Sequence, residues 1–139
     1  MELSPLLVNP VSIQAINTTK APLPVGPYNQ AIVAGDWVYC SGQISLDPIS
    51  GKMISDGSIE AETYQVLTNL RAVLESAGVT TDQVVRTTIF LTNLEDFAKV
   101  NTVYGEFFNK GLYPARACVE VKALPKNARV EIDCIAFLR

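Results

Sequence analysis

The sequence predicts one α/β domain in which two helices cover one face of a β-sheet. Its 139 residues suit a single domain that folds without disulfides or metal. Two segments have helical spacing of apolar residues, and alternating or β-branched runs occupy much of the rest. Two helices can cover only one face of such a sheet, so the other face must meet water or a second subunit. The apolar content of 48% favours a second subunit.

Short strands are predicted in the first third of the chain. Weak alternation indicates a strand over Val11–Asn17. Two apolar runs, Gln30–Val33 and Trp37–Cys40, are separated by Ala34-Gly35-Asp36 and indicate a β-hairpin. The segment Thr18–Pro27 contains three prolines, so we expect an extended connection there.

Two segments have the period of a helix that is apolar on one side. Ser58–Ala77 is the clearer one, because Ser58 suits the N-cap, acidic residues follow in the first turn and Gly78 ends the segment. The second helix is expected to begin at Asn93 as its cap and to end before Gly111. Its apolar positions are Leu94, Phe97, Val100, Tyr104, Phe107 and Phe108. We interpret both apolar stripes as core.

Three further segments are predicted to be strands. Val84–Leu91 is rich in β-branched residues. Ala115–Ala123 and Ala128–Phe137 alternate between apolar and polar positions. The polar turn Leu124–Asn127 joins these last two strands, so they are expected to pair as a hairpin with their apolar sets beneath the helices.

Arg116 stands at the start of the first of these two strands, directly after Pro114-Ala115, and Cys118 shares its side. The alternation predicts that both side chains lie on the face that the helices leave uncovered. In the hairpin register Arg116 lies opposite Ile135 and about 13 Å along the ladder from Glu131. A site that uses both would need long side chains, another arrangement or two subunits. Periodicity alone makes Arg116 a surface arginine, but a guanidinium can also bind a carboxylate through two parallel hydrogen bonds.

The composition argues against several classes of function. The chain has no histidine, which removes Ser-His-Asp and Cys-His catalysis and most transition-metal sites. The three cysteines, Cys40, Cys118 and Cys134, lack Cys-x-x-Cys spacing, so we expect reduced thiols and no zinc site. A net charge of −3 and a pI near 4.9 argue against nucleic acid as the main ligand.

The sequence also predicts where the domain begins and where the protein resides. Met1–Pro10 has no basic residue, so it is expected to be an N-terminal extension, residues 1–10, ahead of a single domain over residues 11–139. No run reaches about 18 apolar residues, so no membrane span is expected. The expected location is the cytoplasm, with an organelle as the alternative.

Several motifs together resemble one protein family. Pro114–Val121, Ala123–Pro125 and Val130–Ala136 are similar to the C-terminal signature of the RidA (YjgF) family, the reactive-intermediate imine and enamine deaminases. Similar segments occur in the same order along the rest of the chain. They are Ala21-Pro22, Gly26–Ala31, Ser41–Ile44, Asp96-Phe97 and Val100–Tyr104. The resemblance covers about Ser12 to Arg139, and many dispersed motifs in order make it specific.

The resemblance implies a chorismate-mutase-like α+β sandwich with a mixed sheet. Three such subunits would form a homotrimer, with the uncovered sheet faces around a central barrel and the sites between subunits. It also implies a reaction that needs no cofactor and no metal. In that reaction, 2-imino and enamino acids such as 2-aminoacrylate and 2-iminobutanoate are hydrolysed to 2-keto acids and ammonia. Pyridoxal-phosphate dehydratases that act on serine or threonine would supply these small molecules.

The resemblance assigns roles to individual residues as well. Arg116 would bind the substrate carboxylate, and Glu131 would hold or activate the attacking water. Tyr28 would close the pocket and offer its phenol to the imine nitrogen or a water, with simple packing as the alternative. The other implied substrate contacts are Ser41, Gly42, Asn101 and Cys118. Asn101 would line the site or support it. A role in shape is favoured for Cys118, because imine hydrolysis needs no covalent intermediate.

Two other functions stay open. The same trimer could be a non-enzymatic, ligand-binding protein with chaperone-like or translation-inhibiting action, as has been described for members of the family. Ribonuclease action has also been claimed for the family. The acidic pI and the missing histidine argue against ribonuclease action here.

Overall fold

The computed structural model describes residues 12–54, 57–109 and 111–139. In these ranges six strands form one sheet and two α-helices pack on it. The strands are β1 (Ile13–Ile16), β2 (Ala31–Ala34), β3 (Trp37–Gln43), β4 (Val84–Leu91), β5 (Ala115–Glu120) and β6 (Val130–Phe137). The helices are α2 (Ile59–Ser76) and α3 (Phe97–Phe107). The predicted N-terminal extension, residues 1–10, lies outside the described residues.

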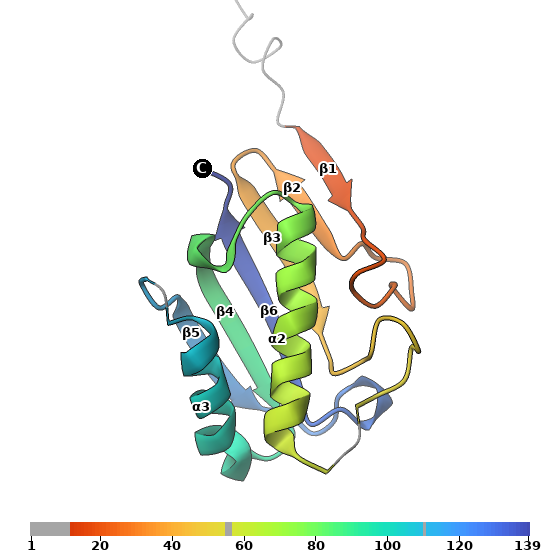
Figure 1. Ribbon diagram of the computed structural model, residues 1–139, viewed down its shortest axis with the longest axis vertical. Helices are drawn as coiled ribbons and strands as arrows, with labels where there is room; N and C mark the ends of the chain where they lie inside the picture. The colour runs from red at the N-terminus through yellow and green to blue at the C-terminus, as the bar shows by residue number, and fades with distance from the viewer. Residues whose placement is uncertain (1–11, 55–56, 110) are drawn as a thin grey trace, which may run out of the picture.

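The predicted two-layer arrangement is confirmed. Helices α2 and α3 lie on the same face of the sheet (Figure 1), where α2 packs against α3, β3 and β6. The strand order is β1-β2-β3-β6-β4-β5. Strands β4 and β5 are parallel and the other neighbouring pairs are antiparallel, so the sheet is mixed.

Helix α2 has the boundaries that the sequence predicts. The Ser58 hydroxyl accepts a hydrogen bond from the backbone N–H of Ala61 at 3.1 Å, as an N-cap does. Gly78 follows the helix with a φ of +85°, a left-handed conformation that ends helices. Helix α3 begins later than predicted, because Asn93 caps a 3₁₀ turn over Leu94–Asp96 and the α-helix starts after that turn.

The last two strands do not form the predicted hairpin. Strand β5 pairs in parallel with β4, while β6 lies between β3 and β4 and is antiparallel to both. A helix between two strands returns the chain to its starting end, so β4, α3 and β5 form a βαβ unit with parallel neighbours. Residues 121–129 then carry the chain past β4 to the middle of the sheet. The turn Pro125–Asn127 belongs to this longer connection and does not join paired strands.

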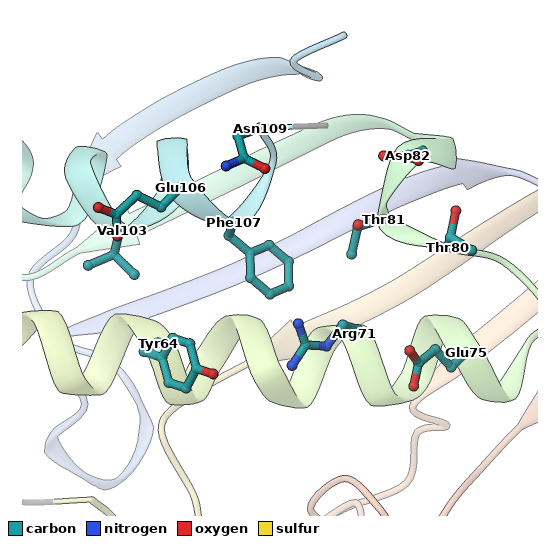
Figure 2. A pocket seen from close by; sticks show the side chains of 10 residues that line it. All are labelled: Tyr64, Arg71, Glu75, Thr80, Thr81, Asp82, Val103, Glu106, Phe107 and Asn109. Atoms are coloured by element: carbon teal, nitrogen blue, oxygen red, sulfur yellow. The ribbon is translucent and has the colours of Figure 1, made fainter. Parts of the chain in front are cut away.

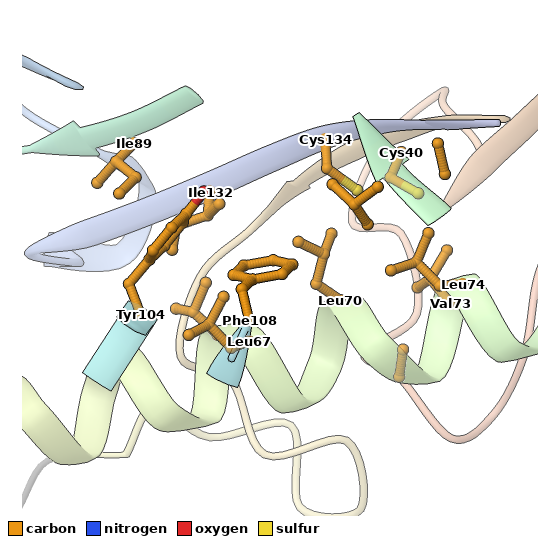
Figure 3. Packing of buried hydrophobic residues seen from close by; sticks show 14 of the residues in the cluster. Cys40, Leu67, Leu70, Val73, Leu74, Ile89, Tyr104, Phe108, Ile132 and Cys134 are labelled. Carbon is orange, nitrogen blue, oxygen red and sulfur yellow. The ribbon is translucent and has the colours of Figure 1, made fainter. Parts of the chain in front are cut away.

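Strand β6 is central and presents its apolar residues to the helices. These residues are Val130, Ile132, Cys134 and Ala136. Leu67, Leu70 and Leu74 of α2 belong to the same core cluster and point toward the sheet (Figure 3). Cys134 is the register partner of Cys40 on β3, and both are buried free thiols. Their mutual hydrogen bond, followed by burial, raises the pKa of Cys134 well above its ordinary value. The pair therefore packs as neutral thiols.

The opposite face of the sheet carries exposed apolar side chains. Trp37 and Tyr39 of β3 are 40% and 47% exposed, and Val119 of β5 is 42% exposed. The ring of Trp37 lies 5.0 Å from the ring of Phe137. No helix among the described residues covers this face, and so much exposed apolar surface favours contact with another subunit.

Candidate active site

Arg116 lies on the side of the sheet that the helices cover, which corrects its expected position on the uncovered face. Its Cζ is 4.9 Å from the centre of the Tyr104 ring on α3, and Cys118 beside it packs against the core. Ala117 and Val119 consequently face the other way. The direction of the alternation was misread because the uncovered face is itself apolar, so the more apolar set of β5 does not mark the helix side.

Three residues of α3 contact the Arg116 guanidinium. Its Nη1 donates a hydrogen bond to Oδ1 of Asn101 at 2.6 Å. Its Cζ lies 5.4 Å from the centre of the Phe97 ring, in addition to the Tyr104 contact. Asn101, predicted to line or support the site, therefore reaches Arg116 directly.

No carboxylate neutralises Arg116 within the part of the chain that the structure describes. The ion pairs there join Arg129 to Glu62 and Arg139 to Asp36. A cavity of about 490 Å³ opens at Arg116. Its wall is formed by Asn101, Tyr104, Gly105, Tyr113, Pro114 and Arg116. A guanidinium without a counter-charge in such a cavity suits a small anion.

A second cavity, of about 370 Å³, brings together four other predicted site residues. They are Tyr28, Ser41, Gly42 and Glu131. The Ser41 hydroxyl donates to the carbonyl oxygen of Asn29 at 2.6 Å, so it holds the chain next to Tyr28. Much of the remaining wall is apolar, from Leu23, Val25, Ile44 and Leu46.

Gln30 fixes the proline-rich segment that leads to Tyr28. The side chain is only 1% exposed. Its Nε2 donates to the carbonyl oxygens of Thr18 at 3.0 Å and Pro22 at 2.8 Å, and its Oε1 accepts from the Thr18 N–H at 2.6 Å. A buried amide with its hydrogen bonds made holds a segment firmly, so one wall of the second cavity is attached to the start of β2.

Gly42 makes room for the Glu131 carboxyl. The register of β3 against β6 shifts between Cys40 and Gln43, and Gly42 lies in this bulge. A Cβ at position 42 would lie 2.8 Å from Cδ of Glu131, closer than real contacts allow. The absence of a side chain at Gly42 therefore permits the observed position of the Glu131 carboxylate.

The Glu131 carboxyl lies in surroundings that favour its protonated form. Burial raises its pKa above the ordinary value, and the nearby charge of Asp133 raises it further. The pKa of Asp133 is itself raised by burial, against the opposing effect of hydrogen bonds from Thr88 and the charge of Arg86. A carboxyl group of raised pKa in a cavity is a candidate for proton transfer.

Arg116 and Glu131 do not share a cavity within one chain. Arg116 is paired with Thr87 of β4, and Glu131 with Phe90 of β4, so β4 separates the two strands. Two strand spacings and three residue steps place their backbones about 14 Å apart. Their side chains also point to opposite faces, because Arg116 contacts α3 whereas Glu131 alternates with buried Ile132.

Cys118 lines neither of these two cavities. It packs against the core beside Arg116. Burial raises the pKa of its thiol, and the charge of Arg116 offsets only part of that rise. A protonated, half-buried thiol is a poor nucleophile, so the structure favours the role in shape over a covalent one.

A larger cavity of about 770 Å³ contains none of the predicted residues. It lies between α2, α3 and the turn over Thr81–Gln83 (Figure 2). Arg71 lies over the Phe107 ring there, with Cζ 5.2 Å from the ring centre, and Glu75, Asp82 and Glu106 line the same groove. Size alone does not make a site, and no glycine lines this groove to admit a carboxylate as Gly42 does.

Comparison with known proteins agrees with the fold. The family model described as endoribonuclease L-PSP matches residues 18–138. The chain belongs to this YjgF/RidA family. The crystal structure of the yjgF gene product from E. coli superposes with a TM-score of 0.86 at 40% identity, covering 91% of this chain and 99% of that one.

Relatives of this RidA family protein have different names. A RutC family protein from Synechocystis sp. is 50% identical, over 92% of this chain and 98% of its own. The 2-iminobutanoate/2-iminopropanoate deaminase of Mus musculus is 46% identical, over 88% of this chain and 90% of its own. Because one fold can host several functions, the activity must be argued from the site.

Several residues around these two cavities were not predicted from the sequence. Phe97 and Tyr104 were interpreted only as core, although their spacing from Asn101 places all three on one side of a helix. Gln30 was treated as an ordinary strand residue, and its burial is a tertiary effect without a local signal. Asp133 could have been found, because two positions along a strand return to the same face as Glu131.

Proposed function

We propose that this protein hydrolyses 2-imino acids, the tautomers of enamino acids such as 2-aminoacrylate, to 2-keto acids and ammonia. The Arg116 guanidinium carries the proposal, because it opens into a cavity and has no counter-carboxylate among the described residues. It would bind the substrate carboxylate through two hydrogen bonds. The mouse relative named as a deaminase of 2-iminobutanoate and 2-iminopropanoate supports these two molecules as substrates.

The proposed enzyme is a homotrimer of chorismate-mutase-like subunits with its sites between neighbours. In an imino acid the carboxyl carbon is bonded to the imino carbon, so the substrate cannot span Arg116 and Glu131 of one chain, which are about 14 Å apart. A second subunit would supply the missing half. The exposed apolar face with Trp37 and Tyr39 supports such an assembly around a central barrel.

The proposed chemistry divides between the two halves. Water adds to C2 of the protonated imine. The C–N bond of the resulting carbinolamine then breaks to leave the 2-keto acid, and the hydroxyl proton leaves with the nitrogen as ammonium. Glu131 accepts a proton from the water and returns it to the departing nitrogen. Tyr28 closes the pocket and offers its phenol to the nitrogen or the water. Arg116 holds a group that does not change, so it contributes affinity, whereas Glu131 contributes rate.

No metal or cofactor takes part in this proposal. The ranges 12–54, 57–109 and 111–139 contain no cluster of three or more His, Cys, Asp or Glu side chains placed to hold a metal ion. Within the same ranges, no helix is both long and apolar enough to cross a membrane. The proposed location is the cytoplasm, where dehydratases would release the substrate, with an organelle as the alternative.

A coupled assay tests the proposal. Threonine dehydratase releases 2-iminobutanoate from threonine, and the appearance of 2-oxobutanoate is followed with increasing amounts of this protein. We expect an acceleration over spontaneous hydrolysis that grows with the protein added and disappears with Arg116→Ala. Equal rates with and without the protein would contradict the proposal.

Gly42→Ala is expected to lower kcat about tenfold and to leave KM within about twofold. The added Cβ would collide with the Glu131 carboxyl and displace it from the attacking water. Gly111→Ala is the matched control, because a Cβ there would meet nothing within 4 Å. Steady-state kinetics of both variants in the coupled assay check this, and an unchanged kcat for Gly42→Ala would argue against Glu131 as the base.

The acid side of the pH–rate profile should depend on Asp133. Glu131 must be ionised to accept a proton, so activity falls as the pH drops through its raised pKa. Asp133→Asn removes a neighbouring negative charge, lowers the pKa of Glu131 and should move this acid limb to lower pH. Lys126 lines the same cavity and keeps its positive charge in this variant, so only the Asp133 charge changes. Asp82→Asn removes an exposed carboxylate elsewhere and is the control. An acid limb at the same pH in Asp133→Asn and wild type would show that the Asp133 charge does not set the pKa of Glu131.

A non-enzymatic trimer is the second candidate. The exposed apolar face around Trp37 and Tyr39 supports a chaperone-like or translation-inhibiting protein. A chaperone-like function predicts that Arg116→Ala protects an aggregating client protein as well as the wild type does.

Ribonuclease action ranks last because the net charge is −3. Nuclease activity that survives purification and is lost in a site variant would reverse that order.

A further inference from the structure

One side of α3 contacts the Arg116 guanidinium. Phe97, Asn101 and Tyr104 are four and three residues apart, so they lie on the same side of the helix. Asn101 accepts from Nη1 at 2.6 Å, and the ring centres of Phe97 and Tyr104 lie 5.4 Å and 4.9 Å from Cζ. We call these three residues the Arg116 cradle.

Tyr104 is itself fixed on its far side. Its hydroxyl shares a hydrogen bond of 2.7 Å with the hydroxyl of Thr87, and both side chains are buried. Thr87 is the register partner of Arg116 on β4. Three contacts therefore connect the elements around Arg116: β4 pairs with β5, the Thr87 hydroxyl binds the Tyr104 hydroxyl, and the Tyr104 ring contacts the guanidinium. These contacts restrain an arginine side chain that otherwise has many rotamers.

The cradle orients the Arg116 guanidinium and leaves most of its N–H donors for a ligand. The Asn101 oxygen takes one N–H, and the ring faces attract the positive charge without using the remaining N–H donors. A carboxylate in the same place would neutralise Arg116 and compete with an anionic ligand. A cradle of one amide and two rings therefore orients the guanidinium and preserves its charge.

We propose that Phe97 and Tyr104 are positioning residues that fix the Arg116 guanidinium before the ligand arrives and thereby set the affinity for 2-imino and 2-keto carboxylates. This inference rests on the proposed function and adds two residues to it. The carboxylate is unchanged by the reaction, so the cradle stabilises ground state and transition state alike. Its loss should raise KM and weaken product binding, while kcat stays nearly constant.

Phe97→Leu is the most direct test, because Phe97 is 36% exposed and leucine removes the ring while keeping an apolar side chain. We expect the Kd for 2-oxobutanoate, measured by calorimetry, and the KM for 2-iminobutanoate to rise about 3- to 10-fold, with kcat within about twofold. Phe97→Tyr keeps the ring and should bind as the wild type does. Tyr104→Phe keeps the ring but loses the Thr87 contact, and should weaken binding about 2- to 5-fold.

Phe107→Leu is the matched control on the same helix. The Arg71 Cζ lies 5.2 Å from the centre of the Phe107 ring, so the variant removes the same kind of contact outside the cradle (Figure 2). We expect unchanged 2-oxobutanoate binding. The cradle is wrong if Phe97→Leu binds 2-oxobutanoate as the wild type does, or if Phe107→Leu weakens binding equally. If Arg116→Ala itself binds 2-oxobutanoate normally, the proposed function fails and not only the cradle. Melting temperatures and the Phe97→Tyr rescue separate lost positioning from lost folding.

Discussion

Arg116→Ala is expected to lower kcat/KM for 2-imino acids about 100- to 1,000-fold, mostly through a higher KM. The change removes a charge-assisted, two-pronged contact with the substrate carboxylate. Arg116→Lys keeps the charge but loses the planar fork, so an intermediate loss of about tenfold is expected. Steady-state kinetics with dehydratase-generated imine measure both, and calorimetry with 2-oxobutanoate gives the affinity directly.

Two further variants decide whether the uncompensated charge of Arg116 is what matters. Asn101→Asp puts a carboxylate where an amide oxygen now lies 2.6 Å from Nη1, so it should bind the guanidinium and exclude the substrate. It should therefore be more damaging than Asn101→Ala, which only removes one hydrogen bond. Arg71→Ala is the control, because Arg71 also lies over a phenylalanine ring but lines neither the Arg116 cavity nor the Glu131 cavity. Normal affinity in Asn101→Asp would contradict a carboxylate site at Arg116.

Local signals in the sequence predicted the elements well. Ser58 and Gly78 mark the ends of α2 because caps and left-handed turns are properties of a few neighbouring residues. The hairpin of β2 and β3 around Gly35, with its φ of +60°, is local in the same sense. One face for both helices followed from their number alone.

Strand order could not be derived from the same signals. The turn at Pro125–Asn127 resembles a hairpin turn, yet β5 and β6 are separated by β4. The helix between β4 and β5 is the signal that predicts parallel neighbours, and it outweighs the short polar turn. The helix side of β5 is a separate difference: the uncovered face is itself apolar, so the more apolar set of β5 does not mark the side that carries Arg116. Its site role came from the resemblance, since alternation alone gave it a solvated surface.

The division of the site between sheet faces predicts complementation between two impaired variants. Arg116→Ala chains keep Glu131, and Glu131→Gln chains keep Arg116. If each site takes Arg116 from one subunit and Glu131 from the next, equal random mixing leaves about one site in four with both residues intact. Denaturing the two variants together and reassembling them should restore about one quarter of wild-type activity in the coupled assay. Mixing the folded variants without reassembly should restore little.

Wild type reassembled with the Arg116→Ala/Glu131→Gln double variant provides the discriminating control. Sites shared between subunits would again be intact in about one case in four, so both mixtures should recover equally. If each site were built within one chain, about one half of the sites would be intact in this mixture, and none would be intact in the mixture of the two single variants. The position of β4 between β5 and β6 is the reason to expect the equal result, because a single chain would have to exchange strands to bring Arg116 and Glu131 to one substrate. Half of wild-type activity in the mixture of wild type and double variant, with none in the mixture of the two single variants, would therefore contradict a site shared between subunits. The carboxylate-binding role of Arg116 would then be judged from the Arg116 and Asn101 variants.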